Sequence, residues 1–370
     1  WAPTGWADDS GYVAGSAQVA GILSGYDHVV NCIAGTVCGG GHNFLKYAVQ
    51  GHNIIGGGSY NIIDGGYSGV FSGRRNSISG GASANFNLIG SGDDNEIASP
   101  SSYAVIGSGL SNDISSLGTY GFIGTGTLCA VTGGFGFIGT GTGSTASGSY
   151  SAVIAGNTCT ASGNYSLAHG SGVSVTGNYS ASFGQTNSVA KHYAYCVGRD
   201  GVSQGAGTVT ISKTKLAEVG DAQAISLVQG VRTTNATLTN MSSVDGDLFE
   251  LPAGKVSAGT CRVILTAMRD GSADANNDSD YTQVSYTGEF GFFWNGTNGF
   301  LFNSSTQTSV TSSPTLDLTA LSANTNNDFT PGAAPHVAIN SGSLRVKVTG
   351  IAATTINWVA RLDIAVTRVS

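Results

Sequence analysis

The chain has 370 residues, enough for two or more domains, with 57 glycines and only 10% charged residues. Glycine does not recur at every third position, which excludes collagen, and an apolar content of 40% with so little charge argues against a disordered chain. The net charge of −7 gives no support to nucleic-acid binding, and the lack of an apolar run of about 18 residues predicts no membrane insertion. Val, Ile, Thr, Tyr, Phe, Ser and Asn are abundant and favour an all-β fold.

A glycine repeat dominates the first half of the chain. Residues 1–25 are an irregular lead-in, and we expect the repeat to occupy residues 26–190. Successive glycines are first 17 residues apart and later 14 to 17 residues apart. The repeat glycines are Gly56, Gly73, Gly90, Gly107, Gly124, Gly139, Gly156, Gly170 and Gly184. A period this short predicts a parallel β-roll or β-helix, with one repeat per coil and glycines at turns that a Cβ atom would block.

A second apolar position recurs in phase with the glycines, at Ile97, Ile114, Val131, Ala146, Ala161, Val175 and Val189. Each coil is therefore expected to hold two short strands with one or two inward side chains. Cys129 and Cys159 occupy equivalent places two coils apart. Because stacked strands lie ~4.8 Å apart, the Cα atoms of these cysteines would be roughly 9–10 Å apart, too far for a disulfide. We predict that most of the six cysteines are buried free thiols.

One aromatic residue recurs in each coil, at Phe86, Tyr103, Tyr120, Phe135, Tyr150, Tyr165 and Tyr179. Coils of 14 to 17 residues enclose too little apolar volume to offset chain entropy, so we expect three copies to pack as a homotrimer. The aromatic stripe would then be a contact between subunits. The alternative is an exposed stripe on which sugar rings stack, and it assigns carbohydrate binding to Tyr150, Tyr165 and Tyr179.

Ionisable residues are unevenly spread along the repeat. Between Ile114 and Ala190 there is no Asp, Glu, Lys or Arg, and His169 is interpreted as structural. General acid–base catalysis needs paired ionisable groups, so this stretch is not expected to be catalytic. The acidic segment Asp93-Asp94-Asn95-Glu96 leaves a glycosidase open, although neighbours along one corner point in different directions. We predict no catalytic residue.

The period breaks at residues 191–207, where charge returns, and this segment is interpreted as a neck. Residues 208–370 show ordinary strand alternation and predict an antiparallel β-sandwich, similar to a jelly roll. The strand over residues 356–366 is the clearest, with Trp358 expected in the core. An Asn-Gly-rich turn predicts a hairpin over residues 289–302.

The aromatic residues of this hairpin fall on two faces. Phe290, Phe292 and Trp294 share one face, which we expect to be core. Phe293 points the other way. It either fills a contact within the trimer or lies exposed near a carbohydrate-binding surface.

The densest cluster of oxygen ligands is formed by Asp270, Asp274, Asp278 and Asp280. Calcium takes about six to eight oxygen ligands from a flexible loop, and the spacing differs from that of an EF-hand. A calcium site and a solvated loop both remain open, and no other cofactor is predicted.

The last coils carry a recognisable pattern, in the segments 147–152 (Ser-Gly-Ser-Tyr-Ser-Ala), 162–170 (Ser-Gly-Asn-Tyr-Ser-Leu-Ala-His-Gly) and 176–184 (Thr-Gly-Asn-Tyr-Ser-Ala-Ser-Phe-Gly). These segments resemble the head repeats of trimeric autotransporter adhesins, which form a trimeric left-handed parallel β-roll. They are also similar to repeats of bacteriophage tail fibres and tailspikes, where a C-terminal β domain that contacts the host follows. The resemblance is sharpest over residues 147–190, looser over 50–146, and does not reach 208–370. No coiled-coil stalk follows the neck, which favours the phage proteins.

The resemblance implies a homotrimeric phage tail fibre or tailspike, located in the virion tail. Its expected partners are a host surface polysaccharide or other receptor and other tail proteins. The neutral Ser/Thr/Asn/Tyr composition suits an uncharged polysaccharide. Two alternatives remain: a tailspike depolymerase that cuts the polysaccharide, and the head of a trimeric adhesin on a bacterial cell surface.

Overall fold

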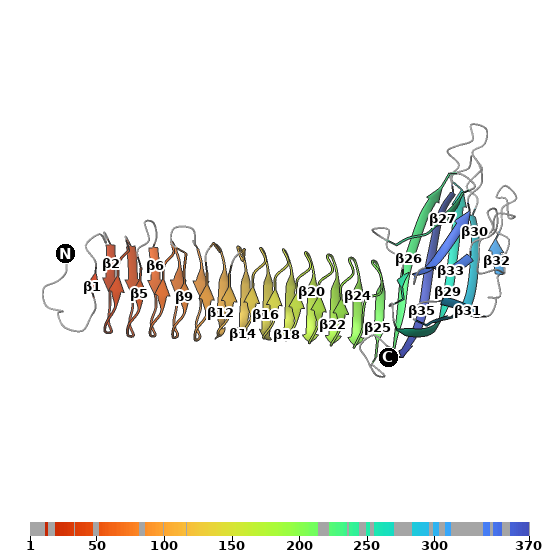
Figure 1. Ribbon diagram of the computed structural model, residues 1–370. Helices are drawn as coiled ribbons and strands as arrows, with labels where there is room; N and C mark the ends of the chain where they lie inside the picture. The colour runs from red at the N-terminus through yellow and green to blue at the C-terminus, as the bar shows by residue number, and fades with distance from the viewer. Residues whose placement is uncertain are drawn as a thin grey trace, which may run out of the picture. The chain divides into compact units, whose positions relative to one another are not determined.

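The computed structural model describes two compact units, Trp1–Gln185 and Thr186–Ser370 (Figure 1). The residues that it describes are 12–13, 19–32, 34–46, 52–80, 86–98, 100–115, 117–213, 222–234, 237–243, 249–251, 255–269, 283–295, 299–302, 308–311, 336–340, 343–349 and 356–369. Every regular element within these ranges is a β-strand, as the composition predicts.

The first unit is a β-solenoid with two parallel sheets, and each coil contributes one short strand to each sheet. The strands of the first sheet are β1 (Tyr12–Val13), β3 (Val29–Val30), β5 (Phe44–Leu45), β7 (Ile62–Ile63), β9 (Ser77–Ile78), β11 (Glu96–Ile97), β13 (Asp113–Ile114), β15 (Ala130–Val131), β17 (Thr145–Ala146), β19 (Thr160–Ala161) and β21 (Ser174–Val175). Those of the second sheet are β2 (Val19–Ile22), β4 (Ala34–Val37), β6 (His52–Ile55), β8 (Gly69–Val70), β10 (Leu88–Ile89), β12 (Val105–Leu110), β14 (Phe122–Thr127), β16 (Phe137–Thr142), β18 (Ala152–Asn157), β20 (Leu167–Ser171) and β22 (Ala181–Gln185). The predicted stack of coils is thereby confirmed.

The core of the solenoid consists of two inward columns, one from each sheet. The predicted column from Ile97 to Val175 is buried, with each of its side chains 0% exposed. The second sheet supplies a matching column that is also 0% exposed, at Ile55, Val70, Ile89, Ile106, Ile123, Ile138, Val153 and Ala168. Each coil thus buries one aliphatic side chain per strand, and the parallel register stacks these chains directly on one another.

A ladder of buried asparagines lines one corner of the solenoid, at Asn43, Asn61, Asn76, Asn95 and Asn112. In the middle of this Asn ladder, the Asn95 Nδ2 donates to the Asn76 Oδ1 (2.9 Å) and to the Gly109 carbonyl (2.9 Å). The Asn112 backbone N–H and Nδ2 donate in turn to the Asn95 Oδ1. Buried polar groups are stable only when they are hydrogen-bonded, and stacking identical amides satisfies each one with the next.

The repeat glycines fall into two columns. Gly56, Gly90, Gly107, Gly124 and Gly139 follow the inward residue of the second sheet, and their φ angles lie outside the left-handed region. A Cβ atom on Gly107 would lie 2.3 Å from the Gly124 carbonyl oxygen, so close stacking of the backbone requires glycine there. The other column holds Gly73, Gly156, Gly170 and Gly184. At Gly73, Gly170 and Gly184 φ is positive, as the turn argument expects.

All six cysteines are free thiols, and all except the half-buried Cys38 are buried. The prediction of buried free thiols is confirmed. Cys129 and Cys159 continue the corner of the Asn ladder, because their backbone N–H groups bond to the side chains of Asn112 and Ser144.

We expect the native protein at pH 8 to react quickly with a thiol reagent at one cysteine per chain, Cys38, and at all six after denaturation. Burial raises the pKa of the Cys32 thiol, and burial followed by the negative charge of Asp363 raises the pKa of the Cys261 thiol. The reactive thiolate is therefore suppressed at pH 8 in the folded state. A colorimetric thiol titration measures this, and Cys38→Ser should remove the fast phase. Fast reaction of several thiols in the native protein would contradict the burial.

The second unit begins with β23 (Ser188–Val189), β24 (Tyr195–Arg199) and β25 (Val209–Ser212), of which β24 and β25 pair in parallel. A larger antiparallel sheet starts at β25 and continues through β26 (Ala222–Thr233), β35 (Ile356–Val369), β29 (Val256–Arg269) and β30 (Gln283–Trp294). Two short strands, β31 (Gly299–Phe302) and β32 (Thr308–Thr311), pair with β30.

A smaller antiparallel sheet is built around β34 (Ser343–Thr349), which pairs with β27 (Leu238–Asn240), β28 (Phe249–Glu250) and β33 (His336–Asn340). Both sheets contribute to one core, which includes Phe249, Phe292, Val346 and Trp358. The predicted C-terminal antiparallel sheets, the 289–302 hairpin and the buried Trp358 are confirmed.

Candidate functional site

The most extended surface feature of the first unit is a column of stacked aromatic rings, which we call the aromatic ladder. Its members are Tyr67, Phe86, Tyr103, Tyr120, Phe135, Tyr150, Tyr165 and Tyr179. Successive ring centroids lie 4.5 to 5.1 Å apart with interplanar angles of 2° to 12°. Each side chain remains between 44% and 53% exposed. The ladder therefore presents ring edges and Tyr hydroxyls to solvent over eight coils.

Every ladder residue has a left-handed backbone conformation, with φ between 50° and 60°. At Tyr150 the reason is visible: the Ser151 N–H donates to the Gly148 carbonyl (3.2 Å), closing a turn whose third residue is the aromatic. The Tyr150 N–H donates back to Gly134 of the preceding coil (2.9 Å). A left-handed conformation costs about 1–2 kcal/mol per residue, and a ring stack contributes about 0.5–1.5 kcal/mol. Stacking and the coil-to-coil bond together offset the strain.

A second exposed apolar column runs beside the ladder, two residues later in each coil. It consists of Leu88, Val105, Phe122, Phe137, Ala152, Leu167 and Ala181, which are in register across the second sheet. Phe122 and Phe137 are 37% and 40% exposed, and their rings stack at 5.3 Å. We call the ladder and this column together the ladder face. It is contiguous, apolar, and free of Asp, Glu, Lys and Arg.

The ladder geometry limits how Tyr150, Tyr165 and Tyr179 can meet a sugar. Tyr165 has a ring on each side, Tyr150 at 4.8 Å and Tyr179 at 5.0 Å. A sugar ring stacks on the face of an aromatic ring, and both faces of Tyr165 are already covered. Within the ladder, the groups that reach a ligand are the ring edges and the phenol hydroxyls.

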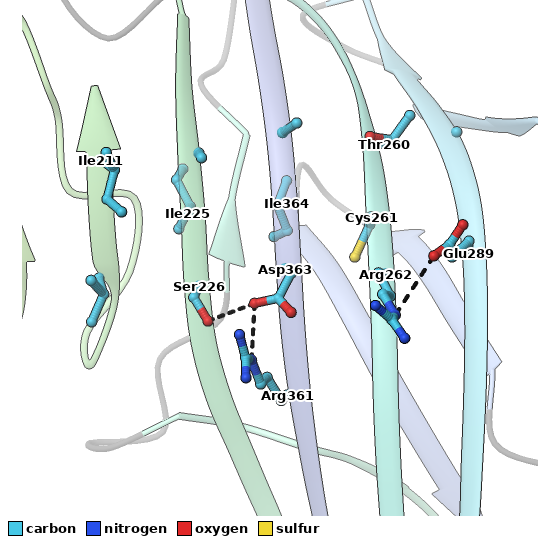
Figure 2. Close-up of a pocket in the computed structure, with 14 residues that line it drawn as sticks. Ile211, Ile225, Ser226, Thr260, Cys261, Arg262, Glu289, Arg361, Asp363 and Ile364 are labelled. Atoms are coloured by element: carbon cyan, nitrogen blue, oxygen red, sulfur yellow. Dashed lines mark hydrogen bonds and ion pairs between the residues drawn. The ribbon is translucent and has the colours of Figure 1, made fainter. Parts of the chain in front are cut away.

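The second unit carries a hollow of about 640 Å³ on the face of its larger sheet that points away from the core. A row of polar residues crosses it in register: Ser226, Asp363, Arg262 and Glu289, from β26, β35, β29 and β30 (Figure 2). The Ser226 Oγ and the Arg361 Nε donate to the same Asp363 Oδ1, at 2.8 and 3.0 Å. The Arg262 Nε lies 3.6 Å from the Glu289 Oε1. The polar row was not predicted from the sequence.

Phe293 lies near this hollow along the chain. It is half-buried, pairs with Ala258, and faces away from the core residues Phe292 and Trp294. By strand alternation it shares its face of β30 with Glu289 and Gly291, which line the hollow.

The acidic corner of the repeat is an ion-pair site. The Asp93 carboxylate contacts Arg74 at 2.6 Å and Arg75 at 3.1 Å. The hydrogen bond from Arg74 lowers the pKa of Asp93, with a smaller contribution from Arg75. A glycosidase acid needs a raised pKa, so Asp93 is unsuited to that role. The His169 ring lies against Phe183, with 5.9 Å between centroids.

The predicted calcium ligands Asp270, Asp274, Asp278 and Asp280 lie outside the described residues. Within the described part of the chain, no group of three or more His, Cys, Asp or Glu residues is placed to hold a metal ion. The same ranges contain no helix with the length and apolarity required to cross a membrane.

No family model and no curated protein matches the chain. Among solved structures, it is similar to the tailspike protein gp49 of Acinetobacter baumannii bacteriophage Fri1, a capsular polysaccharide depolymerase (8% identity, 94% of this chain and 71% of that chain, TM-score 0.20). It is also similar to the tailspike protein of Acinetobacter phage vB_ApiP_P1 (10%, 98% and 70%, TM-score 0.22) and that of Acinetobacter baumannii phage AM24 (7%, 92% and 70%, TM-score 0.21). TM-scores this low do not transfer the activity of those proteins to this chain.

Proposed function

We propose that the chain is part of a homotrimeric phage tail fibre or tailspike that attaches the virion to a glycan on the host surface. The observation that carries the proposal is the ladder face, a contiguous exposed apolar surface on a solenoid. Scattered apolar residues on a surface need no partner, whereas a large continuous patch is typical of an interaction site.

A second copy of the same solenoid is the partner that fits this surface best. The ladder face repeats once per coil, so only a partner with the same rise per coil can match it along its whole length. Its lack of charge means that identical faces meet without repulsion. The resemblance of the last coils to trimeric head repeats favours three copies.

Attachment follows from what such an assembly would do. A stiff solenoid with a buried aliphatic column in each sheet would act as a spacer, with no catalytic group assigned to it. Three copies of a weak glycan site on one particle give avidity far above that of one site. This places the protein in the virion tail, with other tail proteins as partners.

The subunit contact is tested with Phe137→Lys, which puts a charge into the centre of the ladder face. We expect light scattering after size exclusion to give about three times the monomer mass of 37.2 kDa for the native chain, and a single-chain mass for the variant. Thr142→Lys, at the exposed far end of the same strand β16, is the matched control and should remain trimeric. A native chain that is monomeric would contradict the proposal.

Attachment itself is tested by incubating the native protein with surface polysaccharide from candidate host strains. Binding without a change in polymer size supports attachment. Shortening of the polymer would instead identify a depolymerase, and no binding to any host polysaccharide or cell would overturn the proposal.

A further inference from the structure

We infer that the hollow on the larger sheet of the second unit is a glycan-binding site, and that its ligand is an uncharged sugar segment of about one or two rings. The inference rests on the proposed attachment function and specifies where, and to what chemistry, the protein binds. The volume of about 640 Å³ lies within the range of about 300–1,000 Å³ that is usual for small-ligand sites.

The polar row supplies both donors and acceptors for sugar hydroxyls. It crosses four neighbouring strands, so its side chains recur every ~4.8 Å. The contacts of Arg361 and Arg262 with their carboxylates both use Nε, the guanidinium nitrogen closest to the backbone. Each guanidinium carries four further N–H groups. Both contacts of Asp363 use Oδ1, and Glu289 is 71% exposed in its side chain, so carboxylate oxygens are also within reach of a ligand.

The charges of the hollow cancel, which argues for an uncharged ligand. Two arginines face two carboxylates, and each arginine already has an acidic partner within 3.6 Å. An anionic sugar would have to compete with Asp363 and Glu289 for the guanidinium groups. A hydroxyl group can add a hydrogen bond to an ion pair without separating it, because it both donates and accepts.

The row next to the polar row is small and largely apolar. It consists of Ile211, Ala224, Ala365, Thr260 and Gly291, in register across the same strands. Small side chains in this row account for the depression, and Ile211 is 60% exposed at its edge. A pyranose has the same division, with a C–H face and a hydroxyl rim. The sugar face would rest on the small row while its hydroxyls meet the polar row.

The experiment compares the native protein with Arg361→Ala, Glu289→Ala and Asp363→Asn. The probes are D-glucose, D-galactose, L-rhamnose and N-acetyl-D-glucosamine, together with D-glucuronate as the charged counterpart, followed by saturation-transfer NMR. Arg361 and Glu289 are 59% and 71% exposed in their side chains, so these two variants should fold normally. Val359→Ser is the control, because Val359 is exposed on the same face of β35, two residues from Arg361.

We expect at least one uncharged sugar to bind the native protein and the control, and to bind each hollow variant about tenfold more weakly, the effect of losing one good hydrogen bond. Preference for glucuronate would overturn the uncharged ligand. Equal binding by native and hollow variants would overturn the site while leaving attachment intact. A change to single-chain mass in the hollow variants would identify the hollow as a contact between subunits, and binding of no sugar by a protein that still binds host polysaccharide would also overturn the inference.

Discussion

Gly109→Ala is expected to destabilise the solenoid by at least about 3 kcal/mol, which is severe for the addition of one methyl group. Gly109 has a φ of 130°, a region that L-residues rarely adopt, and a Cβ atom there would lie 2.0 Å from the Gly126 carbonyl oxygen of the next coil. The atom in the way is backbone, so no side-chain rotation can relieve the contact. Strain in φ alone costs about 1–3 kcal/mol, and the coils must also separate.

Gly57→Ala is the matched control for this substitution. Gly57 is a glycine of the same solenoid whose φ lies outside the left-handed region, and a Cβ atom added to it would meet no other atom within 4 Å. We expect its melting temperature to stay within about 1 °C of the native value, and that of Gly109→Ala to fall by about 6–12 °C. Thermal unfolding followed by circular dichroism measures both. Equal melting temperatures would show that the coils can move apart at little cost.

The periodic half of the molecule was predictable because each coil repeats the same local chemistry. Ile97, Ile114 and Val131 recur at the coil length, so their common inward column follows from spacing alone. The spacing did not separate the two glycine columns, because Gly73 and Gly90 differ by one coil length while lying at different places in their coils. Which glycine needs a positive φ and which one needs only room for a carbonyl depends on the path of the backbone.

The left-handed aromatic ladder and the hollow were harder to foresee, for different reasons. An aromatic residue with positive φ contradicts intrinsic preference, and the ladder reaches it only because neighbouring coils supply ring stacking and a hydrogen bond. The one signal in the sequence is the constant offset of two residues between each aromatic and the exposed strand residue that follows it, as from Tyr120 to Phe122. In the hollow, Ser226 and Asp363 are 137 residues apart, and their contact depends on antiparallel register between distant strands.

Asn95→Asp is expected to destabilise the solenoid by about 3–5 kcal/mol at pH 7, although the two side chains have nearly the same shape. The Asn95 Nδ2 donates to three acceptors: the Asn76 Oδ1, the Ser91 carbonyl and the Gly109 carbonyl. An ionised carboxylate would place an oxygen against all three and bury an unpaired charge at a position that is 0% exposed.

The same substitution should make stability depend on pH, with a definite sign. Burial and facing acceptors would raise the folded-state pKa of the new carboxyl group above its unfolded value of about 3.9. Below about pH 3.9 the group is protonated in both states and the loss is smallest. As pH rises, the unfolded state ionises first, so the loss grows until pH passes the folded-state pKa. Melting temperatures at pH 3.5 and pH 7 measure this, with Asn157→Asp as the control at an exposed position of the same solenoid. A loss at pH 7 no larger than at pH 3.5 would show that the Asn ladder accepts a negative charge, and that its amide donors are not what holds neighbouring coils in register.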